Sequence, residues 1–179
     1  MRYLVSGLWH LAAATAFAVT FGVFRHGDPT FYLAQVLFDV PLLLTSGACF
    51  FMPDKWSKKG AWKFLHYPLP DWDVLLLGPA SHRNWITHSA VLPIGLLAAV
   101  WKWPQIADIP GFGAWAFGTC LGVASHLFWD CVSSQRHKIV VVPYWFALRE
   151  APSRIYLLSG AVVSLCIGWV FASVQKLGL

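Results

Sequence analysis

The sequence is poor in charged residues. Only 12% of its 179 residues are Asp, Glu, Lys or Arg, whereas 58% are hydrophobic. A soluble domain usually carries about a quarter charged residues, so this low share argues against that class. The eleven tryptophans point the same way, because indole rings favour the boundary between lipid and water. We therefore predict one integral membrane domain over residues 1–179.

Other absences narrow the function. The four cysteines form no Cys-x-x-Cys pair, which argues against a zinc knuckle or a disulfide framework and predicts free thiols. The basic residues that give the net charge of +5 are spread over loops and form no run, so nucleic-acid binding is not expected. No internal repeat or low-complexity segment is present.

Long apolar runs predict an all-α bundle with about five membrane-spanning helices, since about twenty apolar residues cross a bilayer. Thr87 is expected to be the N-cap of the third helix. The first run is longer than the core of a signal peptide and is expected to be retained. A re-entrant or interfacial segment is expected around residues 66–86, where the apolar run is too short to cross. The expected spans cover residues 3–24, 31–52, 87–103, 111–131 and 154–174.

Basic residues predict the orientation of this bundle. With five spans, the N-terminus and the second and fourth loops share one face of the membrane. Because Lys and Arg favour the cytoplasmic side, the richer face predicts a cytoplasmic N-terminus. The opposite face has three basic residues, Arg25, Lys102 and Lys176. The richer face has ten: Arg2, Lys55, Lys58, Lys59, Lys63, Arg83, Arg136, Lys138, Arg149 and Arg154.

Acidic and histidine residues are concentrated in two segments, residues 69–89 and residues 125–130. The predicted topology places both segments at the cytoplasmic boundary. In the second segment the His and the Asp are four residues apart, so on a helix they share one face. The candidate metal ligands are Asp71, Asp73, His82, His88, His126 and Asp130.

Three imidazoles and three carboxylates suit one divalent metal ion or two ions that share carboxylates. Zinc is the first expectation, with manganese, iron or magnesium as alternatives. Such an ion would lower the pKa of a bound water and supply hydroxide near neutral pH. Arg83 is the expected clamp for an anionic group. Asp39 and His10 are expected to be buried hydrogen-bonding groups, and direct ligation by them stays open.

The ordered motifs resemble the YdjM-like family of inner-membrane, metal-dependent hydrolases, whose pattern is PDxD, then HRGxTHS, then HxxxD. They cover about a third of this chain and stand here as Leu69-Pro-Asp-Trp-Asp73, His82-Arg-Asn-Trp-Ile-Thr-His-Ser89 and Ser125-His-Leu-Phe-Trp-Asp130. The resemblance implies that the six candidate ligands form the metal site. It also implies that Arg83 and Thr87 support them, and Asp73 is expected to act in catalysis with these two. Asn84 replaces the family's glycine, and Asp54 follows a second Pro but lacks a second acid two residues on.

The leading hypothesis is therefore a hydrolase that cleaves a phosphoester or related bond of a lipid or other amphiphile at the cytoplasmic leaflet. The resemblance implies that this membrane is the inner membrane of a bacterial or archaeal cell. Its expected partners are membrane lipids and a small-molecule or lipid substrate. A histidine-based lipid phosphatase is disfavoured because its Lys-Arg-Pro and Pro-Ser-Gly-His signatures are missing. Two other hypotheses stay open: a metal-binding transporter or sensor without turnover, and a structural role.

Overall fold

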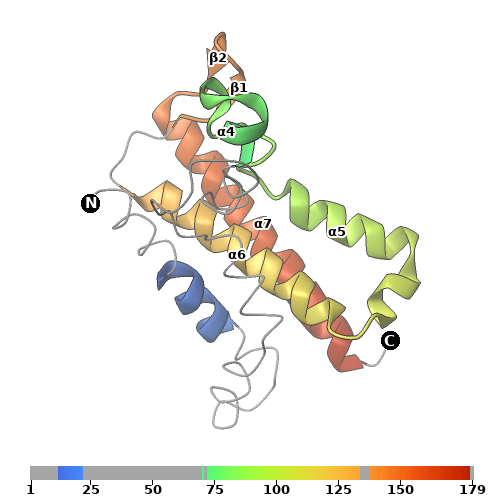
Figure 1. Ribbon diagram of the computed structural model, residues 1–179. Helices are drawn as coiled ribbons and strands as arrows, with labels where there is room; N and C mark the ends of the chain where they lie inside the picture. The colour runs from blue at the N-terminus through green and yellow to red at the C-terminus, as the bar shows by residue number, and fades with distance from the viewer. Residues whose placement is uncertain (1–11, 22–69, 71, 134–137, 178–179) are drawn as a thin grey trace, which may run out of the picture.

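The computed structural model describes residues 12–21, 70, 72–133 and 138–177 of the chain. Helices dominate this part, and one short β-hairpin joins the last two of them (Figure 1). The helices are Ala12–Phe21, α4 (Trp72–Leu77), α5 (Val91–Lys102), α6 (Phe112–Val132) and α7 (Glu150–Leu177), with the 3-10 turns η3 (Pro79–Ser81) and η4 (Pro104–Asp108). The strands are β1 (Val140–Val142) and β2 (Phe146–Ala147).

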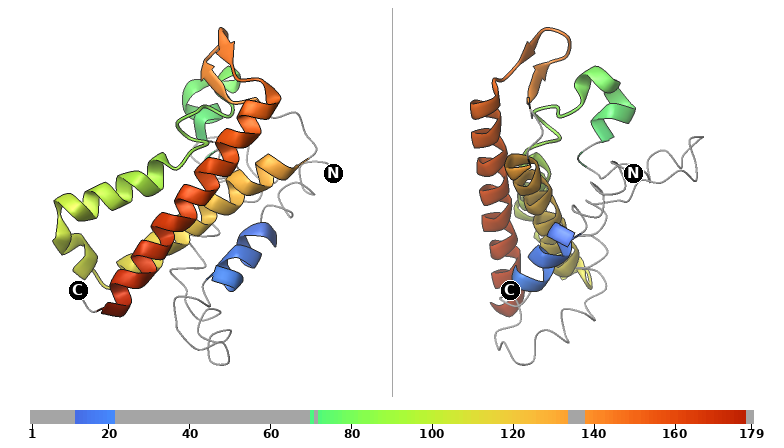
Figure 2. Two further views of the ribbon diagram at one scale, coloured as in Figure 1. Left: turned by 180° about the vertical axis from the view of Figure 1, so that it is seen from behind. Right: turned by 90° about the vertical axis from the view of Figure 1, so that its left-hand side faces the viewer.

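α6 and α7 lie side by side and run antiparallel, as Figure 1 and Figure 2 both show. Their contacts occur in reverse order along the chain: the Cys131 thiol donates to the Arg154 carbonyl, and Leu127 lies against Gly160. A Cβ atom at Gly160 would lie 2.9 Å from Cδ1 of Leu127. The missing side chain therefore leaves room on α7 for the side chain of Leu127.

α6 is the central helix of the described part. From Gly113 to Leu127 every residue except Trp115 is buried. Small residues are frequent along this helix, and it has no continuous polar face, so it can be covered all round. α7 and α5 pack against it, and so does the helix Ala12–Phe21, whose Phe17 ring lies 5.7 Å from that of Phe128.

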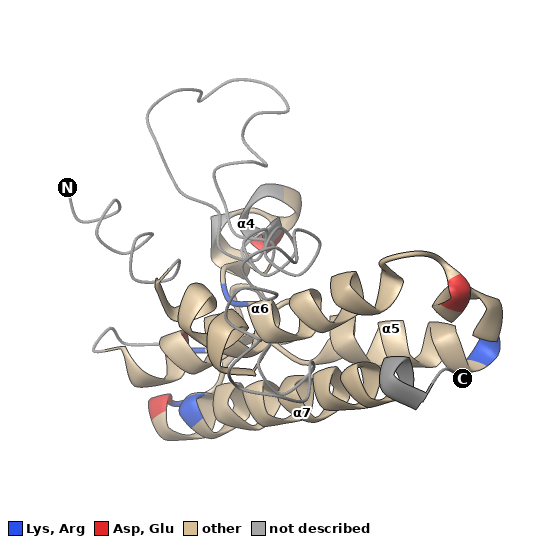
Figure 3. Ribbon diagram, turned by 90° about the horizontal axis from the view of Figure 1, so that it is seen from below, with Lys and Arg blue, Asp and Glu red and all other residues tan. Residues whose placement is uncertain are grey.

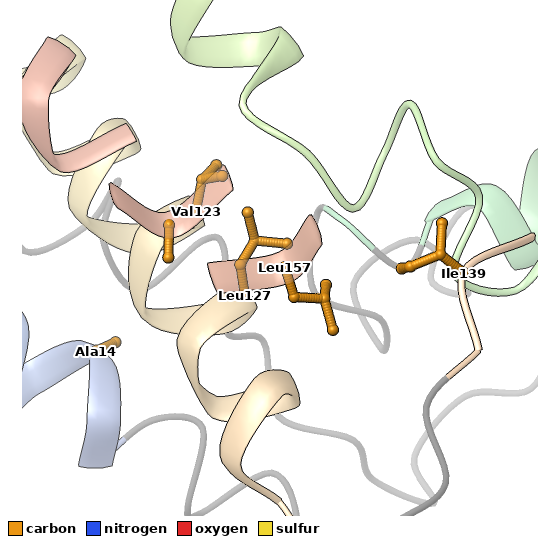
Figure 4. Close-up of a cluster of buried hydrophobic side chains, with 6 residues drawn as sticks. Ala14, Val123, Leu127, Ile139 and Leu157 are labelled. Atoms are coloured by element: carbon orange, nitrogen blue, oxygen red, sulfur yellow. The ribbon is translucent and has the colours of Figure 1, made fainter. Parts of the chain in front are cut away.

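One core cluster joins the helices to the base of the hairpin. Ile139, directly before β1, is fully buried, and its backbone N–H donates to Oγ of Ser153 at 3.0 Å. The apolar contacts hold the start of β1 against the first turns of α7. Figure 4 shows this cluster, which comprises Ala14, Val123, Leu127, Ile139, Leu157 and Ala161.

The β-hairpin corrects the prediction of an all-α fold. β1 and β2 pair antiparallel, with Val142 opposite Phe146, and the turn places Tyr144 at a φ of 63°. A parallel bridge between Asn84 and Val140 then attaches the hairpin to the loop that follows η3. The hairpin therefore connects α6 and α7 and also contacts the segment before α5.

The prediction of a five-span bundle is wrong. Among the described residues one helix, Glu150–Ser173, is long and apolar enough to cross a membrane. α5 has 12 residues, or about 18 Å at 1.5 Å per residue, against a hydrocarbon core of about 30 Å. α6 has 21 residues and carries the buried His126 and Asp130, and it does not qualify as a membrane-crossing helix. The predicted span 31–52 lies outside the described residues, and only residues 12–21 of the predicted span 3–24 are described.

Two local predictions also have an outcome here. Thr87 is not a helix N-cap, because α5 begins four residues later and its N-cap position is Ala90. The three cysteines in the described ranges, Cys120, Cys131 and Cys166, are free thiols, as expected.

Charged residues lie at the ends of the long helices (Figure 3). Between Ile155 and Ser173, α7 carries no Asp, Glu, Lys or Arg. Its first turn holds Glu150 and Arg154, whose side chains pair at 3.1 Å. This pattern is what a lipid-crossing segment needs, because charge in the hydrocarbon core is costly.

Candidate metal centre

Three segments build the candidate site: the start of α4, the nearby loop of residues 82–90, and the last turns of α6, which are distant in sequence from the other two. His126 and Asp130 lie one turn apart on α6, as their spacing predicts, and both are buried. His88 reaches them from the loop, and its ring centroid lies 5.4 Å from that of His126. The helix therefore fixes two groups, and the loop brings in the third.

The loop is folded by hydrogen bonds that its own residues supply. The Asn84 side chain accepts from the N–H of Ile86 at 2.9 Å, and its carbonyl accepts from the N–H of His88 at 2.9 Å. Ser89 then donates to the Ile86 carbonyl and accepts from the N–H of Val91 at the start of α5. Such short polar side chains stabilise tight turns by satisfying nearby backbone groups. This turn directs His88 inward.

His88, His126 and Asp130 form a group that could hold a metal ion. Nε2 of His88 and Nε2 of His126 each lie 3.7 Å from Oδ2 of Asp130, and one donor atom from each of the three residues lies within 4.8 Å of the others. Two ligands of one tetrahedral zinc ion, bound at about 2.0–2.1 Å, lie about 3.4 Å apart. The donor atoms are therefore close to the spacing that a single ion requires.

Asp73 approaches His88 from the opposite edge of the ring. Its Oδ2 lies 3.5 Å from Nδ1 of His88 and accepts hydrogen bonds from Oγ1 of Thr87 and from the N–H of Asn84, both at 2.8 Å. The carboxylate thus faces the nitrogen that points away from Asp130. A carboxylate in this position orients a ligating imidazole and fixes its tautomer.

The carboxyl group of Asp73 is fully buried and ionised. Burial by itself raises its pKa, but the interactions with His82 and His88 and the backbone N–H of Asn84 hold that pKa well below its ordinary value. Oδ1 accepts no hydrogen bond from any residue in the described ranges. The polar atom that it faces is Nδ1 of His82, 3.9 Å away.

Arg83 brings a permanent positive charge to the same group. Its Nε lies 3.6 Å from Oδ2 of Asp130, and its side chain is largely buried. Its φ of 63° is a left-handed conformation that costs a non-glycine residue free energy. Two backbone hydrogen bonds hold it there: the Arg83 carbonyl accepts from the N–H of Val140, and the Val140 carbonyl accepts from the N–H of Trp85.

His82 lies at the rim of the site rather than in the buried group. Its Nδ1 is 3.9 Å from Oδ1 of Asp73, its ring centroid is 6.0 Å from that of His88, and 41% of its side chain is exposed.

The structure thus brings together seven of the predicted residues: Asp73, His82, Arg83, Thr87, His88, His126 and Asp130. It separates their positions, because Asp73 and His82 lie on the side of His88 that faces away from Asp130. Asp71, Asp54, Asp39 and His10 lie outside the described residues. Their predicted contributions stay predictions.

The sequence did not reveal the part played by Asn84 and Val140. Asn84 was noted only as a departure from a family glycine, yet its backbone and side chain shape the loop. Val140 lies 57 positions after Arg83 and determines the backbone of Arg83 through strand-like pairing. The hydroxyl or amide side chain of a turn residue is a readable signal, but an isolated backbone bridge leaves none.

No family model, curated protein or solved structure matches this chain. The resemblance to the YdjM-like family therefore stays a prediction from the three motifs.

Proposed function

We propose that the protein is a membrane-associated, metal-dependent hydrolase whose ion is held by His88, His126 and Asp130. The observation that carries this proposal is the buried His-His-Asp group, with a second carboxylate behind one imidazole. A divalent ion bound there would supply hydroxide at neutral pH from a bound water. Zinc suits two imidazoles and one carboxylate best, with manganese, iron or magnesium as alternatives.

The chain's own residues prepare this site. Asp73 and Thr87 act as positioning residues, because Thr87 donates to the carboxylate that faces Nδ1 of His88. Three donor atoms in the buried group suffice for one ion. A second ion would have to be bound by the buried Asp73 and by His82, which lies at the rim.

An amphiphilic substrate with an anionic group suits the surroundings of the site. Exposed apolar side chains flank the buried donors on both elements, namely Trp85 and Ile86 on the loop and Phe128 and Val132 on α6. Arg83 stands 3.6 Å from Asp130 and would contact phosphate oxygens with its guanidinium group. We therefore propose a phosphoester or related bond of a lipid or amphiphile as the substrate.

The proposed location is the cytoplasmic face of an inner membrane. Because the five-span topology is wrong, the orientation rests on α7 alone. Lys138, Arg149 and Arg154 lie at or before its N-terminal end, whereas Lys102 and Lys176 lie toward its other end. Basic residues favour the cytoplasmic side, so this end and the adjacent site would lie there.

The test is metal analysis and turnover on purified variants. His126→Ala is expected to lose bound metal and all hydrolysis of phospholipid and phosphoester probes. Asp108→Asn, which changes an exposed acid at the end of η4, is the matched control and is expected to retain both. Full metal content in a folded His126→Ala protein would contradict the proposed site.

A metal sensor or transporter without turnover is the second candidate. Complete burial of His88 and near-complete burial of His126 favour it, because an ion held there would be poorly accessible to a substrate. Metal binding that depends on His126, without cleavage of any probe in the panel, would support this function instead.

A further inference from the structure

The tip of the β-hairpin carries large side chains that the described protein leaves in the open. Tyr144 is 92% exposed and Trp145 is 86% exposed, and Phe146 is exposed as well. Aromatic side chains of this size normally bury most of their surface in a core or an interface. Their exposure at the end of a two-stranded hairpin makes this tip a candidate contact surface.

The hairpin lies against the loop that carries the site. The carbonyl of Val140 accepts from the N–H of Trp85 at 3.0 Å. The side chains of Trp85 and Ile86 on that loop are exposed too. We use the name aromatic patch for five exposed side chains. Tyr144, Trp145 and Phe146 lie at the tip of the hairpin, and Trp85 and its apolar neighbour Ile86 lie on the loop beside Val140. Figure 2 shows the hairpin and this loop at the end of the molecule where α7 begins.

The charge beside the patch is positive. Lys138 and Arg149 flank the hairpin and are exposed. Glu150, the nearest acid in sequence, pairs with Arg154 at 3.1 Å. Indole and phenol rings together with basic side chains are typical of surfaces that meet lipid headgroups.

The patch is continuous with the candidate membrane span. α7 begins three residues after β2 ends, and most of its outward side chains from Ile155 to Val170 are apolar, with Ser159 as an exposed polar exception. A helix of 24 residues is about 36 Å long, which exceeds the hydrocarbon core by about 6 Å. Its first turn and the hairpin would then lie at headgroup depth.

We propose that the aromatic patch docks into the headgroup layer of an anionic membrane and holds the metal centre at that depth. The backbone bridge between Val140 and the loop transmits the anchoring to Arg83, because the carbonyl of Arg83 and the N–H of Trp85 both pair with the backbone of Val140. This inference does not depend on turnover, because it concerns the position of the loop at the membrane surface.

A photo-crosslinking experiment tests the position of the tip. Trp145 is replaced by p-benzoylphenylalanine in the full chain, which is reconstituted into phosphatidylcholine vesicles with or without phosphatidylglycerol. Irradiation is expected to give lipid adducts of the protein by mass spectrometry. Lys138→Gln and Arg149→Gln are each expected to lower the preference for phosphatidylglycerol adducts about fivefold.

The contrary outcomes are distinct. If the crosslinker yields a covalent dimer, the patch contacts a second copy, and the lipid proposal is wrong. The fluorescence of Trp145 is the part of the emission that is lost in Trp145→Phe. If no adduct forms and aqueous iodide quenches this fluorescence, the tip lies in water, and the proposal is also wrong. Crosslinking is run on both metal-free and metal-loaded protein. The position of the tip can therefore be interpreted even if the protein proves not to be a hydrolase.

Discussion

Asp73 and Asp130 face opposite edges of the His88 ring, and their positions indicate different roles. Asp130 has an oxygen 3.7 Å from Nε2 of His88, whereas Asp73 has one 3.5 Å from Nδ1. Only the first shares the space that His126 also faces. At the residue scale, the site is thus a His-His-Asp group with an orienting carboxylate behind it.

Asp73→Asn is expected to weaken metal binding by about 10-fold to 100-fold while leaving one ion bound at saturation, because the orienting group is lost but the donors remain. Asp130→Asn is expected to abolish binding over the same concentration range. Isothermal titration with zinc measures both. Equal losses in the two variants would show that Asp73 is itself a ligand.

The i, i+4 spacing of His126 and Asp130 was enough to predict that they share a face, because a helix repeats every 3.6 residues. The distinction between Asp73 and Asp130 could not be predicted in the same way. It depends on which nitrogen of His88 each carboxylate faces, and that follows from the turn around Asn84.

At the scale of elements, the pairing of α6 with α7 holds two of the three donors in place. Two glycines of α7 face α6: a Cβ at Gly160 would meet Leu127, and one at Gly168 would lie 3.1 Å from Cβ of Cys120. Leu127 is fully buried and lies one position from His126. Disturbance of this contact therefore reaches the site.

Gly160→Ala is expected to destabilise the protein by about 1–3 kcal/mol through overpacking against Leu127. Gly95→Ala on α5 is the matched control, because a Cβ there meets nothing within 4 Å. That variant is expected to be neutral or more stable by up to about 1 kcal/mol. Thermal unfolding in detergent measures both, and equal stability of the two variants would show that the close helix contact is unimportant.

Arg154 supports the C-terminal end of α6 from the first turn of α7. Its Nη1 donates to the Cys131 carbonyl, and its Nη2 donates to the Ser133 carbonyl at 3.3 Å. A helix leaves its last carbonyls without internal partners, and a guanidinium group satisfies them. Asp130 lies in this same last turn.

Arg154→Met is expected to lower stability by about 1–2 kcal/mol and to weaken metal binding, since the turn that carries Asp130 loses its support. Glu150→Gln removes only the exposed ion pair with Arg154 and is expected to cost less than about 1 kcal/mol. Unfolding and zinc titration are measured on the same samples. Unchanged zinc affinity in Arg154→Met would separate the cap from the site.

At the scale of the whole molecule, α7 is the helix of the described part that is long and apolar enough to cross a membrane. Its apolar stretch is free of charged side chains, and the candidate site and the hairpin lie near its N-terminal end (Figure 1). A single crossing by this helix would place the residues after it on the opposite side from the site.

A C-terminal fusion to alkaline phosphatase, expressed in a bacterial host, is therefore expected to be active outside the cytoplasm. The corresponding fusion to a green fluorescent protein is expected to be dark. Insertion of the same reporters after Lys138 is expected to give the reverse result. A fluorescent C-terminal fusion would contradict the proposed orientation of α7.

By itself, the sequence determined the helical character of the described part, the stretch of α7 and the two residues that share a face of α6. These follow from local composition and helical periodicity, which need no knowledge of distant contacts. The prediction of a five-span bundle was based on apolar content, and it was wrong for that reason. Apolar content alone does not separate a helix covered by protein, such as α6, from one that faces lipid.

Only the tertiary structure decided how the two acid- and histidine-rich segments, residues 69–89 and 125–130, come together. The helix Phe112–Val132 and the loop after η3 are joined through a hairpin that pairs Val140 with Asn84, and apolar packing around Ile139 fixes the base of that hairpin. Such contacts between distant segments depend on the shape of the packed core. No run of neighbouring residues encodes them, so the arrangement of His88 between Asp73 and Asp130 became visible only in three dimensions.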